Sequence, residues 1–425
     1  MQENVTTIKS DILNESYQLI DTPCGLKVAC YTMEKHSGVH GVFATNFGSI
    51  DRKFIVGGKE QEIPAGVAHF LEHKMFEDED GDAFDKFSKT GASANAFTGF
   101  DKTCYIFTAT DNVEESLDIL LSFVTKPYFT KETVEKEQGI IGQEIKMYDD
   151  SANWRALFGV LDGLYKNHAV KYDIAGTTES IAEITPEMLY KCADAFYCPS
   201  QMMLSVAGNI TAEQVVAAVE RAGLSDQKAD VKKVLANEPE EINYSQKSIK
   251  MPISIPLVAM GFKENFKAPI TAEKEIIGDI IMEVLTGSTS ELFNKLYDEN
   301  IVNGTFEGEI FSGTDYYSEI ISGETAQPEV LIAEVEAAID KMKKDGITKE
   351  QFETSKNAMY GSMIMDFENI EEVATNIVNA YFSGETAYNS LEVLSRLTLK
   401  DVNDGLKHMF DNKKRTIFTI LPSED

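Results

Sequence analysis

Basic residues are scarce in this chain of 425 residues. It contains 39 lysines and arginines against 70 aspartates and glutamates, which gives a formal net charge of −31. A charge of that sign argues against nucleic acid and anionic membranes as partners, because both would repel the chain. It favours cationic ligands, although acidity that only keeps a protein soluble explains the charge equally well.

Cysteines with metal-site spacing and long hydrophobic runs are absent. The five cysteines show no C-x-x-C spacing and are odd in number, and no apolar signal peptide opens the chain. We therefore expect reduced thiols in a cytoplasmic protein. No uninterrupted apolar run approaches the length that spans a membrane. The hydrophobic content of 43% is still ample for two globular domains with sizeable cores.

Histidine is rare too, but two of the six histidines carry the strongest signal in the sequence. Residues 64–73 predict the start of a helix, with Pro64 in its first turn. His69 and His73 are four residues apart, so both rings leave one face of the helix, as two ligands of one zinc ion must. Glu72 lies beside them, where its carboxylate can take a proton from a water on the metal.

The order H-x-x-E-H reverses the commoner H-E-x-x-H zinc motif and is the inverzincin signature. A helix whose two histidines face solvent or a partner protein is the alternative. The apolar neighbours favour a largely buried helix instead; they are Val67, Phe70, Leu71, Met75 and Phe76. Buried imidazoles need partners, and a metal ion is a good one.

A third ligand must come from elsewhere, because catalytic zinc is held by three protein side chains. Thr130 is the predicted N-cap of a long helix. Glu137 and Glu144 are seven residues apart on this helix, so they share a face, and either could supply the ligand. The helix also carries Glu132 and Glu135, however, and acidic helix faces are usually solvated.

The order of predicted elements divides the chain in two. Residues 26–33 and 39–50 alternate in the manner of strands and look like neighbours in a sheet. Residues 224–246 are charged and aperiodic, and we interpret them as a linker between domains at 1–223 and 247–425. The second half repeats the element order of the first in outline but lacks the histidine pair. This pattern indicates duplication followed by loss of the metal chemistry.

The motif Ala68-His69-Phe70-Leu71-Glu72-His73 resembles the A-H-F-L-E-H motif of the insulinase or pitrilysin family of zinc peptidases. The similarity is to the branch that includes mitochondrial processing peptidases and small bacterial peptidases. Residues 134–145 resemble the family helix that carries two glutamates. The resemblance implies that Glu144 is the zinc ligand and that Glu137 supports the site from close by.

Residues 93–98 resemble the family's edge strand along the substrate, which assigns substrate contacts to Asn95 and Ala96. The resemblance covers nearly the whole chain. It implies an α/β (α+β type) fold of two homologous domains, each a mainly antiparallel sheet with helices on one face, that form half of a clamshell. It also implies Zn²⁺ as cofactor, zinc endopeptidase activity on peptides in a closed chamber, and a homodimer or a heterodimer with a related chain.

One departure concerns an arginine and a tyrosine that the family's second domain often directs at the substrate. Tyr297 stands where the arginine is expected and Asn303 where the tyrosine is expected. Tyr297, Tyr316 and Tyr317 are candidates to replace them. The departure also favours a rival function, a subunit that is inactive without a partner chain. A structural zinc site is disfavoured, because no fourth His or Cys lies near the motif.

Overall fold

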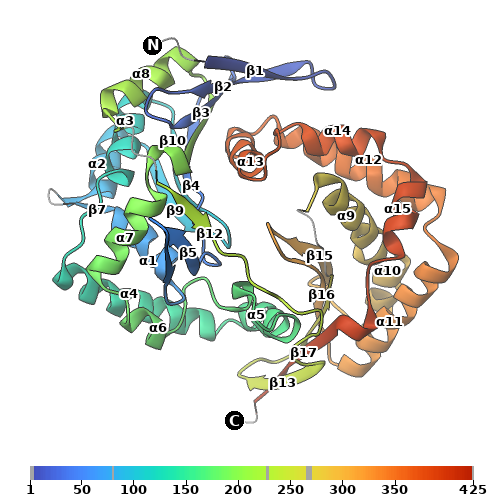
Figure 1. Ribbon diagram of the computed structural model, residues 1–425. Helices are drawn as coiled ribbons and strands as arrows, with labels where there is room; N and C mark the ends of the chain where they lie inside the picture. The colour runs from blue at the N-terminus through green and yellow to red at the C-terminus, as the bar shows by residue number, and fades with distance from the viewer. Residues whose placement is uncertain (1–3, 79–80, 226–228, 265–269, 424–425) are drawn as a thin grey trace. The chain divides into compact units, whose positions relative to one another are not determined.

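The computed structural model describes residues 4–78, 81–225, 229–264 and 270–423 (Figure 1). They form two compact units, each of which takes segments from both halves of the sequence. Unit 1 comprises Met1–Ile145, Asp173–Leu235 and Ile364–Tyr388, and unit 2 comprises Lys146–Tyr172, Ala236–Met363 and Asn389–Asp425. These units interleave along the chain, whereas the predicted division at 224–246 is contiguous and stays a prediction.

Unit 1 is built on a seven-stranded sheet of order β1-β2-β3-β11-β4-β10-β9. In that order its strands are Asn4–Ser10, Glu15–Asp21, Lys27–Thr32, Met202–Gly208, Val39–Thr45, Thr103–Ala109 and Ser93–Thr98. β3 and β11 pair in parallel, and the other neighbours are antiparallel. The expectation that β3 and β4 are neighbours is wrong, because β11 lies between them. Alternation reveals a strand but not its partner.

The helices of unit 1 lie on both faces of this sheet. Phe107 of β10 stacks near Phe87 of α2, whereas the next residue, Thr108, donates a hydrogen bond to Glu371 of α13. Successive strand residues point to opposite faces, so α2 and α13 cover opposite faces. The helices are α1 Val67–Met75, α2 Ala83–Thr90, α3 Val113–Val124, α4 Lys131–Asp149, α6 Thr178–Ala182, α7 Pro186–Phe196, α8 Ala212–Ala222 and α13 Ile370–Phe382.

Part of the predicted linker is a strand of unit 1. β12, Val231–Lys233, pairs with β5, Lys53–Val56, which pairs in turn with β6, Lys59–Glu62. Lys233 also forms an ion pair with the buried carboxylate of Asp51 at 2.8 Å. Residues 226–228 of the linker lie outside the described residues. A two-stranded ladder of β7, Glu77–Asp78, and β8, Gly81–Asp82, precedes α2.

Unit 2 repeats the central topology of unit 1. Its five-stranded sheet has the order β13-β17-β14-β16-β15, with strands Gln246–Met251, Arg415–Pro422, Leu257–Lys263, Tyr317–Glu324 and Glu307–Ser312. Its last strand, β17, pairs in parallel with its first, β13, as β11 pairs with β3 in unit 1. The predicted pair of similar, mainly antiparallel α/β halves is confirmed.

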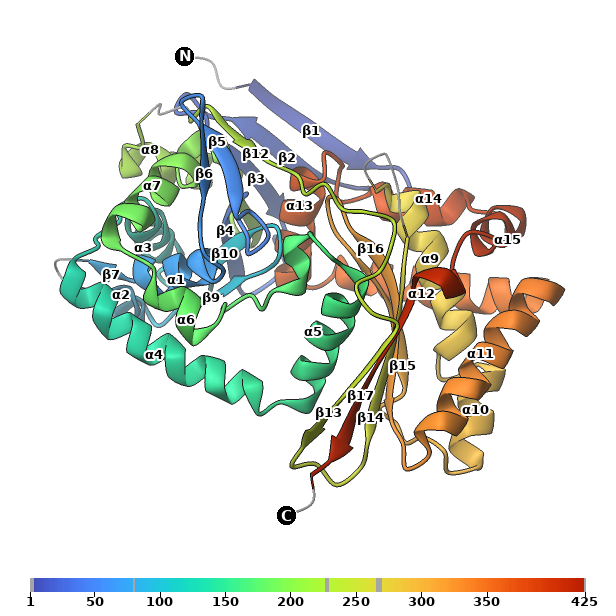
Figure 2. The same ribbon diagram turned by 60° about the horizontal axis from the view of Figure 1, so that its bottom comes forward.

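A helix from the first half of the sequence packs against the sheet of unit 2. α5, Ala152–Leu164, lies along β13, β14 and β17 (Figure 2). Gly159 and Gly163 allow this close approach, since a Cβ atom at either position would lie 2.5 Å or less from Phe418 or Thr416. On β14, Gly261 faces Val160 of α5, whereas the next residue, Phe262, joins the core beneath α9, Ala272–Thr286. α5 and α9 therefore cover opposite faces. Helices thus cover both faces of the sheet in each unit, and the prediction that they lie on one face is wrong.

The remaining helices of unit 2 are α10 Glu291–Asp298, α11 Pro328–Asp345, α12 Lys349–Asp366, α14 Asn389–Arg396 and α15 Leu399–Leu406. Most of its core lies between these helices, α9 and the sheet. Among the described residues of both units, none forms a helix that is long and apolar enough to cross a membrane.

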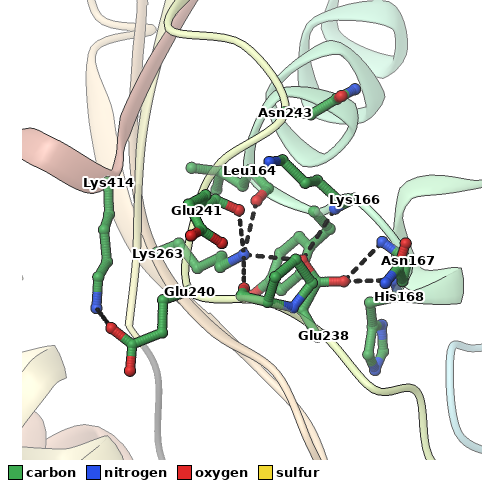
Figure 3. Close-up of polar contacts among 12 residues, drawn as sticks. Leu164, Lys166, Asn167, His168, Glu238, Glu240, Glu241, Asn243, Lys263 and Lys414 are labelled. Carbon is green, nitrogen blue, oxygen red and sulfur yellow. Dashed lines mark hydrogen bonds and ion pairs between the residues drawn. The ribbon is translucent and has the colours of Figure 1, made fainter.

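A buried lysine binds the segment that precedes β13. The ammonium of Lys263 lies 2.8 Å from the carboxylate of Glu238 and donates to the carbonyls of Leu164, Pro239 and Glu241 (Figure 3). The Glu238 carboxylate also accepts three backbone N–H bonds, from residues 166–168. Every charge in this cluster therefore has partners, which buried charges require.

Candidate metal centre

Helix α1 presents His69, Glu72 and His73 toward one region of unit 1. The helix begins at Val67, after Gly66, so Pro64 precedes it rather than occupying its first turn. Gly66 has φ +93°, and a Cβ atom there would lie 2.5 Å from the carbonyl oxygen of Ala175. The loop therefore needs glycine at this position, and the tight contact fixes where α1 starts.

Helix α4 brings two carboxylates to the histidines. Thr130 accepts a hydrogen bond from the backbone N–H of Thr133 at its start, in keeping with the predicted cap. Glu144 Oε1 lies 3.6 Å from His69 Nε2, and Glu144 Oε2 lies 3.4 Å from His73 Nε2. One ligand atom from each of the three residues lies within 4.8 Å of the other two.

Hydrogen bonding fixes the proton on His73. Its Nδ1 lies 2.9 Å from Oε1 of Glu137, which is 5% exposed. A carboxylate only accepts, so Nδ1 carries the proton and the lone pair of Nε2 points toward Glu144. Burial by itself lowers the pKa of His73, but the hydrogen bond to Glu137 and the charges of Glu72, Glu137 and Glu144 raise it above its usual value.

His69 is held as a neutral imidazole. Burial, with a smaller effect of the charge on His73, lowers the pKa of His69 to about 3. Its buried Nδ1 has no hydrogen-bond partner among the described residues. Two neutral imidazole nitrogens and one carboxylate oxygen are a donor set that suits catalytic zinc and leaves a further position for water. The residues present thus fit this metal.

Glu72 lies on the same helix but is not part of the converging ligand set. Its side chain is largely buried, and its Oε2 accepts a 2.6 Å hydrogen bond from the hydroxyl of Thr98 in β9. Burial raises the pKa of Glu72, while the bond from Thr98 and the charge on His73 offset part of that increase. A carboxylate of raised pKa beside a metal site is suited to proton transfer.

Comparisons with known proteins show the family of this chain. The family described as insulinase (peptidase family M16) matches residues 54–178, and the M16 inactive domain matches residues 183–359. YmfH of Bacillus subtilis, which is named a zinc protease, is 36% identical over 94% of this chain and 95% of its own. The chain belongs to the insulinase family of peptidases. Family membership and the names of such relatives support a zinc-dependent peptidase.

Two more proteins resemble this chain. The zinc protease YmxG of Bacillus subtilis is 27% identical over 86% of this chain and 91% of its own. A crystal structure of an M16-like protein from Alicyclobacillus acidocaldarius has 30% identity and a TM-score of 0.91, and covers 100% of this chain and 99% of the other. The match of an inactive domain to much of the second half agrees with the single histidine pair of the sequence.

The residues predicted to contact substrate fall in both units. Asn95 and Ala96 lie in β9, the edge strand of the unit 1 sheet, and Asn95 Oδ1 accepts a 2.9 Å bond from the Ala96 backbone N–H. In unit 2, Tyr297 of α10 is 53% exposed, whereas Tyr317 is buried and donates its hydroxyl to the Lys274 carbonyl.

Tyr316, another candidate replacement, and Asn303, the second position that departs from the family, also lie in unit 2. Tyr316 is buried, and Asn303 donates a side-chain hydrogen bond to Glu324 at 2.8 Å. The structure thus brings together the five residues predicted on α1 and α4, namely His69, Glu72, His73, Glu137 and Glu144. Sequence reasoning missed the bond from Thr98 to Glu72, although Thr98 ends the predicted edge strand.

Proposed function

We propose that this chain is a zinc-dependent endopeptidase that hydrolyses peptides or unfolded segments. The observation that carries the proposal is the convergence of His69, His73 and Glu144, with Glu72 beside them, in a member of the insulinase family. His69 and His73 would bind the metal through Nε2 and Glu144 through a carboxylate oxygen.

The residues around this centre have separate roles. Zinc bound there supplies a Lewis acid that polarises the scissile carbonyl and lowers the pKa of water toward neutrality. Glu72 accepts the proton of the attacking water and later passes it to the leaving amine. Glu137 holds the Nδ1 proton of His73 and so keeps the ring oriented, as carboxylates behind metal-binding histidines do.

The substrate would bind along β9. The Ala96 N–H of this edge strand is bonded to the adjacent Asn95 side chain, and a peptide carbonyl can replace that partner. Strand addition of this kind gives affinity through the backbone with little side-chain selectivity. The net charge of −31 favours peptides that carry positive charge.

A second chain would complete the enzyme in the cytoplasm. One chain supplies two similar sheets but one candidate metal centre among the residues that the structure describes. We propose that a homodimer, or a heterodimer with a related chain, encloses the substrate in a chamber and thereby spares folded proteins. Such an interface should bury more than ~1,000 Å² to be specific.

A second candidate function is a subunit that is inactive until a partner chain joins it. It is favoured by the pair of residues at the positions of the family's arginine and tyrosine. Tyr297 has no guanidinium, and Asn303 is already bonded to Glu324. In this case the partner chain would supply the groups that stabilise the developing oxyanion.

The test is incubation of the zinc-loaded chain with a mixed peptide library, followed by mass spectrometry of the products. We expect internal cleavage by the wild type and loss of cleavage in Glu72→Gln, with zinc content unchanged. Solution mass and activity are measured over the same dilution series. A fully active species at 47.2 kDa, or ready cleavage of folded proteins, would refute the chamber. Cleavage that requires an added related chain would favour the subunit.

A further inference from the structure

Thr98 donates to the Glu72 carboxylate through its hydroxyl and also through its backbone N–H. Thr98 Oγ1 lies 2.6 Å from Glu72 Oε2. Thr98 is the last residue of β9, whereas Glu72 lies in α1, so the bond joins the edge strand to the metal-site helix.

The surroundings of Thr98 fix the direction of this bond. Thr98 Oγ1 is also 3.4 Å from Oγ1 of Thr103, which is fully buried. The single hydroxyl proton of Thr103 goes to the carbonyl of Phe47 at 2.9 Å, so Thr103 cannot donate to Thr98. An ionised carboxylate only accepts. Thr98 must therefore be the donor to Glu72, and a hydrogen bond to a charged group is among the stronger ones.

We propose that Thr98 is a positioning residue for proton transfer, because its hydroxyl holds Glu72 by Oε2 and thereby orients the carboxylate toward the attacking water. This inference rests on the proposed function of Glu72 as general base. A carboxylate on a flexible two-carbon stem needs such a tether, since catalysis depends on orientation of the reacting groups. Thr98 itself is not one of the predicted metal ligands, and the predicted substrate contacts in β9 are Asn95 and Ala96.

Unit 2 contains the same bond without the histidines. Ser312 ends β15, as Thr98 ends β9, and its hydroxyl donates to Glu275 of α9 at 2.6 Å. The two hydroxyl residues also occupy the same place in their ladders, because Thr98 pairs with Thr103 and Ser312 pairs with Tyr317, the first residues of the next strands. Loss of the Ser312 bond therefore measures what such a bond contributes to the fold alone.

The experiment compares Thr98→Val, Thr98→Ser and the matched control Ser312→Ala. Thr98→Val keeps the shape of the side chain and the backbone N–H bond to Glu72 but removes the hydroxyl donor. We expect it to lower kcat by roughly 10–100-fold, as loss of a hydrogen bond to a charged group does, with KM changed by less than about threefold. Thr98→Ser restores the donor and should recover most of kcat. Ser312→Ala should leave kcat unchanged.

Two further measurements separate positioning from other effects. Zinc affinity, measured by competition with a chelator, should be the same in Thr98→Val as in wild type. A crystal structure of zinc-loaded Thr98→Val should show the Glu72 carboxylate rotated from its wild-type orientation. Wild-type kcat in Thr98→Val, failure of Thr98→Ser to recover it, or an unmoved carboxylate would overturn the inference. If wild type cleaves no peptide, the proposed function fails, but rotation of Glu72 in Thr98→Val still tests the tether.

Discussion

Replacement of Glu137 tests the structure of the metal centre most directly. Glu137 is the partner of the Nδ1 proton of His73, and its side chain is buried. A hydrogen bond to a charged group is worth about 1.5–3 kcal/mol, which corresponds to roughly 10–150-fold in an equilibrium constant. Glu137→Leu leaves the Nδ1 proton of His73 without its acceptor. Zinc affinity should therefore fall by a factor near the upper end of this range, roughly 150-fold. Glu137→Gln keeps an oxygen but loses the charge and should fall nearer to ~10-fold.

Glu144→Gln should weaken zinc more than either change at Glu137, because it removes a charged ligand rather than the support of one. Equilibrium competition with a chromophoric chelator at fixed pH gives the zinc affinities of wild type and of the three variants at Glu137 and Glu144. Glu135→Gln is the matched control, since Glu135 lies on the same helix but is exposed and pairs at the surface with Lys131. If Glu137→Gln lost more zinc than Glu144→Gln, the roles of the two glutamates on α4 would be reversed.

The remaining predictions concern the fold and the charge. Lys263→Met should lower the free energy of unfolding by ~3–5 kcal/mol, because it leaves the Glu238 carboxylate without its cation. Denaturant titration should show that a second change, Glu238→Gln, recovers part of this loss. Gly66→Ala should cost ~1–3 kcal/mol through backbone strain and the clash with Ala175, and thermal unfolding should show little or no loss in Gly139→Ala, where a Cβ atom meets open space. Cleavage of a cationic peptide should slow more than that of a neutral one as the Debye length falls from ~10 Å at ~0.1 M salt to ~3 Å at ~1 M. Equal salt dependence of the two cleavage rates would show that the net charge does not favour cationic peptides.

Local signals in the sequence predicted most of the helices of the site. The cap at Thr130 and the spacing of Glu137 and Glu144 placed both carboxylates on α4, and His69 and His73 fell on one face of α1 as predicted. These predictions succeed because capping and helical periodicity depend on residues a few positions apart. The choice of Glu144 rather than Glu137 as the zinc ligand needed the resemblance to a family. Both residues lie on the same face of the helix, so periodicity does not distinguish them.

The features that the sequence did not predict depend on distant residues. β11 enters the sheet between β3 and β4 from more than 150 residues further along the chain. Gly66 rather than Pro64 sets the start of α1, because the loop at Ala175 packs against it. The bond from Thr98 to Glu72 likewise joins a strand and a helix 26 residues apart. None of these contacts leaves a periodic pattern in the sequence.

The exchange of α5 and α13 has a consequence for how such a chain could arise. Each sheet is covered on one face by a helix that the opposite half of the sequence supplies. A half-length ancestor would have had one face of its sheet without a covering helix. Two copies could have covered these faces by exchanging their helices. Such an ancestor would have been a domain-swapped dimer, in which neither copy was complete alone. Fusion of the two copies into one chain would have made the exchange of helices permanent. One half could then lose its histidines while its helix continued to cover the sheet of the other half.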